Sequence, residues 1–565
     1  MIEASLVIAT YNRAAQLAVC LDALARQTIS PTAFEVIVVV DGSTDGTIEW
    51  LDQFKPPYAM RVARQSNRGQ CMALNRGAEV AHGEICIFLD DDIVAGPELV
   101  AEHIRVHRQR PDAVGIGQLA MRLPATADWF TRGFARDWQA HYAGLDAGSQ
   151  PTWQDCYGGN MSVARRTFVD SGGFDASLAR AYDVELAYRL AKLGCSFVYL
   201  AHARGIQDQT KERQALLTDA ERSGTACVEL YRRHPAVLPI LLGAFGEQRP
   251  TLATALRVLL AIGVAPGALE RLDWLVRRAA GPDTAYQLLH RYSFWRGVHR
   301  AWPDVETRPQ LTTGTPILMY HAFARADEPA SRYVMPLERF SQQIGWLKRW
   351  RYRIISLDEL LRYRAEHRLP PPRSVVITID DGYLDTWTRA HSVLRAHRVP
   401  ATVFAVTDRV GQKNDWAREA ALRGRPLLSW SEMRRMHGDG VQFGAHTRSH
   451  ADLTLLSSKL ARAEIVGSRR RLEEQLGAAV RSFAYPYGKH SADVAGLVEA
   501  AGFDVACGIN AGLNTPATSS HALRRVEIFG TDSLLEFALA LRFGARFDVL
   551  WKRAAGLAVR TGGRS

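Results

Sequence analysis

Short apolar runs alternate with longer amphipathic segments through the first 205 residues. Segments 4–10, 34–43 and 83–92 each contain an apolar run of strand length, and segment 13–27 carries apolar residues at helical spacing. This alternation predicts a mostly parallel sheet with helices on both faces. Ligands of such sheets bind outside the carboxyl ends of the strands. We therefore expect an α/β domain over residues 1–205, with its site at the strand ends.

The pattern changes between residues 206 and 308. This segment has helical periodicity interrupted by proline and glycine, without strand alternation. We interpret it as a helical extension and connector.

Strand–helix alternation resumes over residues 309–545. Apolar strand patterns recur at 316–323, 374–383, 401–407, 441–447, 481–488 and 503–509. Amphipathic segments such as 457–476 separate them. The pattern predicts a second α/β domain, a distorted (β/α) barrel, followed by a basic tail at 546–565.

The chain has 565 residues, which suits two or three domains. No apolar run of 18 residues or more is free of charge, so a membrane-spanning helix is not expected. The N-terminus lacks the basic and cleavage segments of a signal peptide. None of the seven cysteines stands in a Cys-x-x-Cys pair. Together these features favour a cytoplasmic protein.

The net charge is +11. Nine arginines fall between Arg249 and Arg308, interleaved with aromatic and aliphatic residues, and the tail is basic and amphipathic. Both regions are candidates for peripheral contact with the inner face of the cell membrane; solvated helix faces are the alternative. No helix-turn-helix, zinc knuckle or aromatic-basic sheet pattern is present, so we expect no nucleic-acid partner.

Carboxylates stand at predicted strand ends in the first domain. Asp41 ends one strand segment, and Asp90 and Asp92 lie one residue apart after another. Such a pair can join a divalent cation, Mg²⁺ or Mn²⁺, to a diphosphate. Asp183, on a separate segment, could accept a proton from an incoming hydroxyl.

Six segments in this order resemble family 2 glycosyltransferases of the nucleotide-sugar-binding fold. They are VIATYNR at 7–13, VVDGSTDGT at 39–47, NRGQCMALNRG at 67–77, FLDDD at 88–92, GGNMSVARRTFVDSGGFD at 158–175 and YDVELAYRLAKLG at 182–194. The resemblance implies a nucleotide-sugar donor, an inverting transfer and an acceptor that is a glycan or a lipid-linked saccharide.

The resemblance also implies residue roles. Asp41 would contact the nucleoside, and Asp183 would be the general base. Asp90 and Asp92 would hold the metal and the donor diphosphate. The implied donor-binding residues are Thr10, Asp41, Asn67, Arg68, Asp90 and Asp92. Two positions depart from the family pattern: Val40 precedes Asp41 and Tyr182 precedes Asp183. Glu185 is the reserve candidate for the base.

A second group of chemical residues lies in the C-terminal half. Asp380 and Asp381 follow an apolar strand pattern, and His446 and His450 stand four residues apart, on one face if that turn is helical. One carboxylate and two imidazoles make an open site for a divalent ion. The other aspartate is then free to act as base on a water that the metal activates. The implied reaction is metal-assisted hydrolysis of an acyl group.

These motifs resemble polysaccharide deacetylases of carbohydrate esterase family 4. The resemblance implies that Asp380 is the base and that Asp381, His446 and His450 bind Zn, Co, Ni or a similar metal. It implies that Tyr487, in FAYPYG, donates its backbone N–H to the oxyanion. The arginine that many members carry two residues before the motif's proline is replaced by Ala484.

The general acid of this family usually lies in a late Leu-x-His motif, which is absent here. PILMYHAF at 316–323 instead resembles the exopolysaccharide deacetylase subgroup, whose barrel is circularly permuted. This resemblance implies His321 as the acid that protonates the leaving amine. His490 or a solvent-mediated proton is the next candidate.

The sequence thus predicts a bifunctional enzyme of surface polysaccharide or glycoconjugate synthesis. One domain would transfer a sugar, and the other would remove an acetyl group, most plausibly the N-acetyl of a hexosamine. The alternative is a glycosyltransferase with a degenerate, glycan-binding deacetylase domain.

Overall fold

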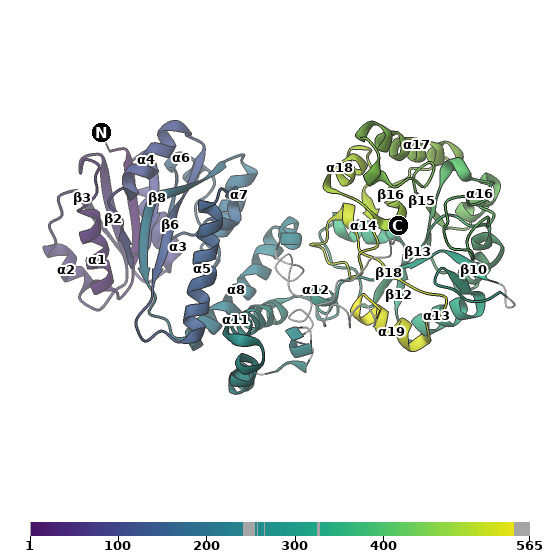
Figure 1. Ribbon diagram of the computed structural model, residues 1–565. Coiled ribbons are helices and arrows are strands. Elements are labelled where there is room, and N and C mark those ends of the chain that lie inside the picture. The colour runs from purple at the N-terminus through teal and green to yellow at the C-terminus, as the bar shows by residue number, and fades with distance from the viewer. Residues whose placement is uncertain are drawn as a thin grey trace. The chain divides into compact units, whose positions relative to one another are not determined.

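The computed structural model describes residues 2–240, 266–324 and 328–546, with short pieces at 255–256, 258–260 and 262–264 (Figure 1). The basic tail proposed as a membrane contact lies outside these residues from 547 on. The chain forms two compact units. The first contains residues 1–232 and 259–301, and the second contains residues 233–258 and 302–565.

The first unit is built on an eight-stranded sheet in the order β3-β2-β1-β4-β7-β6-β8-β5. Strands β3, β2, β1 and β4 are parallel, whereas β7 runs antiparallel to both of its neighbours. The strands are β1 (Ala4–Thr10), β2 (Phe34–Asp41), β3 (Ala59–Gln65), β4 (Ile85–Leu89), β5 (Ile93–Ala95), β6 (Ala113–Arg122), β7 (Asn160–Ala164) and β8 (Ser196–Asp208). This confirms the mostly parallel sheet.

Helices cover both faces of this sheet, because alternate residues of its central strands enter two separate hydrophobic clusters. In β2, Val36 and Val38 belong to one cluster, and Ile37 and Val39 to the other. The helices are α1 (Ala14–Leu24), α2 (Thr47–Gln53), α3 (Gln70–Glu79), α4 (Leu99–Gln109), α5 (Trp129–Asp146), α6 (Arg165–Asp170) and α7 (Tyr182–Lys192).

Two further helices of this unit, α8 (Arg213–Arg233) and α11 (Pro266–Ala301), follow the sheet. A side chain at Gly224 would meet the backbone of Phe294, and one at Gly297 would meet the backbone of Glu221, so glycines permit close packing of the two helices. Gly281, with φ 84°, breaks α11 just before Pro282.

The second unit contains a sheet of parallel strands in the order β17-β16-β15-β14-β13-β9-β18, with β12 paired to β13. A parallel bridge between Cys507 of β17 and Leu523, just before β18, links its two ends. The strands are β9 (Ile317–Tyr320), β12 (Arg353–Ile355), β13 (Ser374–Ile379), β14 (Thr402–Ala405), β15 (Gln442–Ala445), β16 (Ser482–Ala484), β17 (Val505–Cys507) and β18 (Val526–Glu527). The expected distorted (β/α) barrel is confirmed.

Helices surround this barrel (Figure 1). They are α12 (Gln310–Thr313), α13 (Leu337–Arg349), α14 (Leu357–Ala365), α15 (His391–His397), α16 (Trp430–Gly438), α17 (Ser458–Leu476), α18 (Ala492–Ala500) and α19 (Leu534–Phe543). A small parallel pair, β10 (Ala322–Ala324) and β11 (Val334–Pro336), follows β9.

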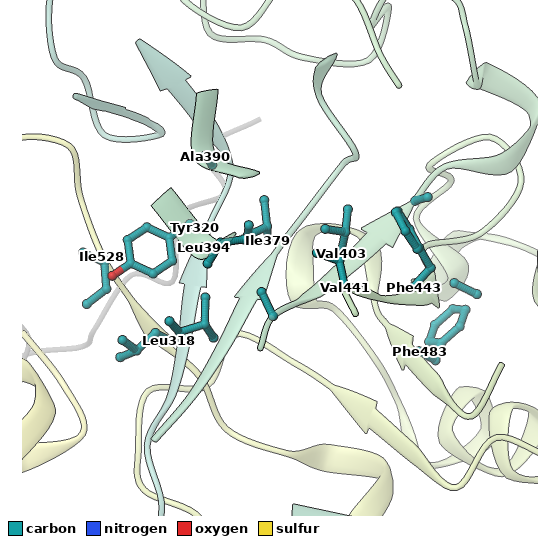
Figure 2. Close-up of a cluster of buried hydrophobic side chains, with 14 of the residues drawn as sticks. Leu318, Tyr320, Ile379, Ala390, Leu394, Val403, Val441, Phe443, Phe483 and Ile528 are labelled. Atoms are coloured by element: carbon teal, nitrogen blue, oxygen red, sulfur yellow. The ribbon is translucent and has the colours of Figure 1, made fainter. Parts of the chain in front are cut away.

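The barrel core joins residues far apart in the chain. Leu318 of β9, Ile379 of β13 and Ile528 beyond β18 belong to one buried cluster, shown in Figure 2. Burying one such aliphatic side chain stabilises the fold by about 1.5–3 kcal/mol. The first strand of the domain therefore lies between β13 and the last strand, β18. This is the arrangement that the permuted subgroup predicts.

Within the part of the chain that the structure describes, no helix combines the length and the hydropathy needed to cross a bilayer.

Candidate active sites

The turn after β4 gathers three carboxylates with unequal partners. Asp91 is held by Thr10 Oγ1 at 2.8 Å and by Arg13 at 2.7 Å. Arg13 also lies 3.1 Å from Asp92, which accepts from Gln207 at 3.0 Å. The middle carboxylate thus anchors the turn. The predicted donor residue Thr10 serves in that anchoring.

Asp90 is a carboxylate with a raised pKa. Burial raises its pKa to about 7, and Asp92, Asp91 and Asp183 add to the effect. Its hydrogen bond from Gln70 Nε2, at 3.0 Å, is a neutral one. Carboxylates clustered at a strand end fit a divalent cation with oxygen ligands, so Asp90 and Asp92 could hold the predicted Mg²⁺ or Mn²⁺.

Asp183 lies at the start of α7, next to the glycine pair 158–159. Its carboxylate accepts the N–H of Gly158 at 2.8 Å. A Cβ at Gly159 would stand 2.8 Å from Asp90 Oδ2. Burial raises the pKa of Asp183, although the backbone N–H of Gly158 acts against it. The predicted base and the predicted metal ligand are far apart in sequence, and the glycine pair brings them close together.

The three remaining donor-binding candidates also meet. Asp41 accepts the N–H groups of Arg68 and Gly69, each at 2.8 Å. Gly42 approaches Asn67 closely, since a Cβ there would lie 2.7 Å from the Asn67 nitrogen. Asp41 thus fixes the 67–69 loop at the strand edge.

Glu185, the reserve candidate for the base, has a different role. It is 3% exposed, and Arg189 of the same helix pairs with both of its oxygens. Arg189 also donates to the carbonyls of Ser171 and Gly173. Glu185 therefore fixes α7 to the preceding loop, and Asp183 is the carboxylate directed at the Asp90 turn.

In the barrel, Asp381, His446 and His450 meet in an arrangement suited to a metal. Asp381 Oδ1 lies 3.5 Å from His446 Nε2 and 3.3 Å from His450 Nε2. All three residues are buried, and their ligand atoms lie within 4.8 Å of one another. One carboxylate and two imidazoles fit zinc or a similar ion and leave coordination positions open.

The main chain sets the tautomer of His446. Its Nδ1 donates to the Ala484 carbonyl at 2.7 Å, so the Nε2 lone pair faces Asp381 and His450. At Ala484 the family resemblance had led us to look for an arginine. In this chain its backbone, not its side chain, contributes to the site.

The turn between the two histidines is not helical. Residues 446–450 form an irregular turn, in which the His450 N–H donates to Thr447 Oγ1 at 2.9 Å. Several site residues have left-handed backbone. These are Asp381 at φ 72°, Thr447 at 60°, His450 at 64° and Tyr487 at 56°. Such strained backbone is concentrated at functional sites in proteins.

Sequence reasoning missed the main partner of the predicted base. Arg525, before β18, is fully buried and donates to both oxygens of Asp380, at 2.6 and 2.8 Å. Burial acts to raise the pKa of Asp380, but Arg525, together with His446 and His321, lowers it below its usual value. Asp380 therefore remains ionised and able to accept a proton.

His321 ends β9 at the same mouth. Ile379 pairs with Tyr320, and the Asp380 N–H donates to the Tyr320 carbonyl at 2.9 Å, so Asp380 and His321 stand at neighbouring strand ends. The imidazole lies against Tyr333, with ring centroids 4.7 Å apart. Burial acts to raise the pKa of Asp381, but His446 and His450 lower it, and His321 adds to that lowering.

Aromatic rings flank the metal-ligand cluster. Trp416 stacks on His450 with centroids 4.8 Å apart, and Tyr487 meets the same imidazole edge-on at 4.7 Å. Within the described residues, the Tyr487 N–H has no hydrogen-bond acceptor, as an oxyanion donor requires. Trp416 belongs to the loop between β14 and α16, which carried no recognisable motif.

The other late histidines are engaged elsewhere. His490 stacks on Tyr485 with centroids 4.6 Å apart, and His521 Nε2 donates to the Phe503 carbonyl at 2.8 Å.

Comparison with known families agrees with this division. Residues 5–172 match the model of Glycosyl transferase family 2, and residues 367–506 match that of Polysaccharide deacetylase. The chain joins a family 2 glycosyltransferase domain to a polysaccharide deacetylase domain. Asp183, His321 and Arg525 lie outside the matched segments, so their assignment depends on the geometry above.

Parts of the chain are similar to proteins of known name. Poly-beta-1,6-N-acetyl-D-glucosamine N-deacetylase of Staphylococcus aureus is 26% identical over 215 residues, covering 36% of this chain and 71% of the relative. Streptococcus pyogenes deacetylase PplD in complex with acetate is 24% identical, with TM-score 0.36, covering 40% of this chain and 98% of that one. Mannosyltransferase PcManGT from Pyrobaculum calidifontis, in complex with GDP-Man and Mn²⁺, is 20% identical, with TM-score 0.39. The match covers 53% of this chain and 87% of that one.

Proposed function

We propose that this bifunctional enzyme transfers a sugar from a nucleotide-sugar donor with inversion and removes the acetyl group of an N-acetylhexosamine. The observation that carries the second reaction is the Asp381, His446 and His450 cluster beside the Asp380–Arg525 pair. The name of the Staphylococcus aureus relative supports an N-acetylated hexosamine as its substrate. Surface polysaccharide or glycoconjugate synthesis on the cytoplasmic side would use both reactions.

In the deacetylase, a divalent ion held by Asp381, His446 and His450 would polarise the acetamide carbonyl and acidify water. Asp380 removes a proton from the water as its oxygen attacks the carbonyl carbon. The Tyr487 N–H donates to the oxygen that becomes negative. The carbon–nitrogen bond then breaks, His321 gives its proton to the departing amine, and acetate remains.

In the transferase, Asp183 would remove the proton of the acceptor hydroxyl as that oxygen attacks the anomeric carbon. Attack opposite the departing nucleoside diphosphate inverts the configuration. A cation held by Asp90 and Asp92 would neutralise the diphosphate charge. Asp41, Asn67 and Arg68 would bind the nucleoside. The acceptor would be a glycan or a lipid-linked saccharide.

The alternative is a transferase whose barrel only binds glycan. The intact ion pair between Asp380 and Arg525 favours catalysis, because a buried carboxylate kept ionised by a buried guanidinium is a costly arrangement.

The test uses the full chain with manganese and a panel of radiolabelled nucleotide sugars, followed by acetate release from acetylated oligosaccharides. We expect Asp183→Asn to lose transfer and keep acetate release, and His446→Ala to do the reverse. Acetate release that survives His446→Ala would refute the proposed deacetylase site. Transfer that survives Asp183→Asn would refute the proposed base.

A further inference from the structure

In the first half of α11 an acidic residue, Asp273, is turned inward and neighbouring apolar residues are turned outward. Asp273 is 9% exposed, accepts from Arg213 at 2.9 Å and lies 3.6 Å from Arg277. The next two residues face solvent: Trp274 is 53% exposed and Leu275 is 45% exposed. A helix that only packs on its own domain normally shows the opposite pattern.

The outward residues form one stripe. Arg271, Trp274, Leu275 and Arg278 are all exposed and follow the i, i+3, i+4, i+7 spacing of a single helix face. We refer to these four residues as the α11 stripe. The ion pairs of Asp273 use Arg213 and Arg277, which are not in the stripe. Neither Arg271 nor Arg278 has an acidic partner among the described residues.

The opposite side of the helix is fixed to its own unit. The Arg277 guanidinium lies 4.9 Å from the ring centre of Trp129, and that of Arg213 lies 5.1 Å from the same ring. These cation–π contacts and the Asp273 pairs orient the helix. The α11 stripe therefore points away from the body of the unit.

We propose that the α11 stripe docks the enzyme on an anionic lipid surface. Indole rings favour the boundary between headgroups and acyl chains, and arginines pair with lipid phosphates. An apolar pair flanked by two arginines matches both layers of such a surface. Ile262, on the segment before α11, is 70% exposed and adds apolar area to this part of the unit. The inference goes beyond the two proposed reactions and does not depend on them.

The test is co-sedimentation of the full chain with vesicles of phosphatidylglycerol and phosphatidylcholine, compared with phosphatidylcholine alone. A basic residue at such a surface contributes about fivefold in binding, so Arg271→Gln with Arg278→Gln should weaken partitioning roughly 30-fold. Trp274→Ser with Leu275→Ser should weaken it about tenfold or more. Arg271→Lys with Arg278→Lys should retain most binding, since the charge remains.

Matched controls come from other surfaces. Trp350, on the barrel, is also 53% exposed, and Trp350→Ser should leave partitioning unchanged. Arg166→Gln with Arg462→Gln removes equal charge from other exposed positions and should have a much smaller effect. A melting temperature equal to that of the wild type establishes that each variant is folded. If Trp274→Ser with Leu275→Ser does not fold, the single variant Trp274→Ala replaces it.

Several outcomes would overturn the proposal. These are unchanged partitioning of both stripe variants, an equal loss in the matched controls, and equal binding of the wild type to phosphatidylcholine alone. If the stripe variants bound RNA less tightly than the wild type but bound vesicles equally well, the stripe would be assigned to nucleic acid instead.

Discussion

Arg525 donates to both carboxylate oxygens of Asp380 inside the barrel, although 145 residues separate them. The pair connects the segment before the last strand to the end of β13. It also lowers the pKa of Asp380, against the effect of burial. Arg525 is therefore a positioning residue of the deacetylase site, acting through Asp380.

Replacing Arg525 with Met should shift the pH dependence of deacetylation. Without the guanidinium, only His446 and His321 would oppose the effect of burial, so the pKa of Asp380 would rise. We expect the acidic limb of the kcat/KM profile to move to higher pH, with activity partly recovered under alkaline conditions. Arg525→Lys should show a smaller shift. An unmoved acidic limb in the Met variant would contradict the assignment.

The same pair should contribute to stability with a defined pH dependence. Because the folded-state pKa of Asp380 is depressed, its contribution is present above the unfolded pKa and is lost as pH falls through the folded value. Breaking a buried pair costs about 3–5 kcal/mol. Urea unfolding of Arg525→Met should show this loss at neutral pH and a smaller loss in strong acid. A loss of equal size at every pH would indicate a packing effect.

Replacing His321 with Ala should slow deacetylation by roughly 10²–10⁴-fold, the range for loss of one positioned proton donor. Metal content by mass spectrometry should stay near the wild-type value, whereas His450→Ala should lower it. His490→Ala is the control, because His490 stacks on Tyr485 and should change the rate little. A larger fall for His490→Ala than for His321→Ala would reverse the assignment of the acid.

Asp90 and Asp183 should separate donor binding from turnover. Asp90→Asn removes a charge that would hold the cation, so manganese-dependent donor binding should weaken and transfer should be lost. Asp183→Asn should lower kcat with little change in donor affinity, because the base acts on the acceptor. Isothermal titration with the donor, beside rate measurements, distinguishes the two. Normal transfer by the Asp90 variant would exclude the proposed cation site.

Gly159→Ala should impair transfer without affecting deacetylation. The added Cβ would stand 2.8 Å from Asp90 Oδ2, so the carboxylate or the turn must move. We expect at least a tenfold loss of kcat/KM for transfer, in line with the cost of displacing catalytic groups by about 1 Å. Gly144→Ala is the control, since its nearest neighbour atom would be 3.7 Å away. Equal activity of the two variants would show that the turn tolerates a side chain.

The sequence was sufficient to predict the strands that lead into Asp90, Asp381 and His321, because an apolar run followed by polar residues is a local signal. The permuted position of β9 also followed from its motif. Arg525 was missed because its partner lies on another strand and no local spacing marks the pair. The convergence of His446 and His450 was predicted, but the left-handed turn that produces it was not, since such turns at residues other than glycine leave little trace in sequence.

The direction of β9 decides where the connector is attached. The strand runs parallel to β13 and β18 and ends at His321, so the polypeptide arriving from residue 302 enters at the base of the barrel. The segment that leads into β9 thus joins the barrel at the end remote from the catalytic opening. His321 and the metal-ligand cluster therefore stand at the opposite end of the barrel from the residues that lead into β9.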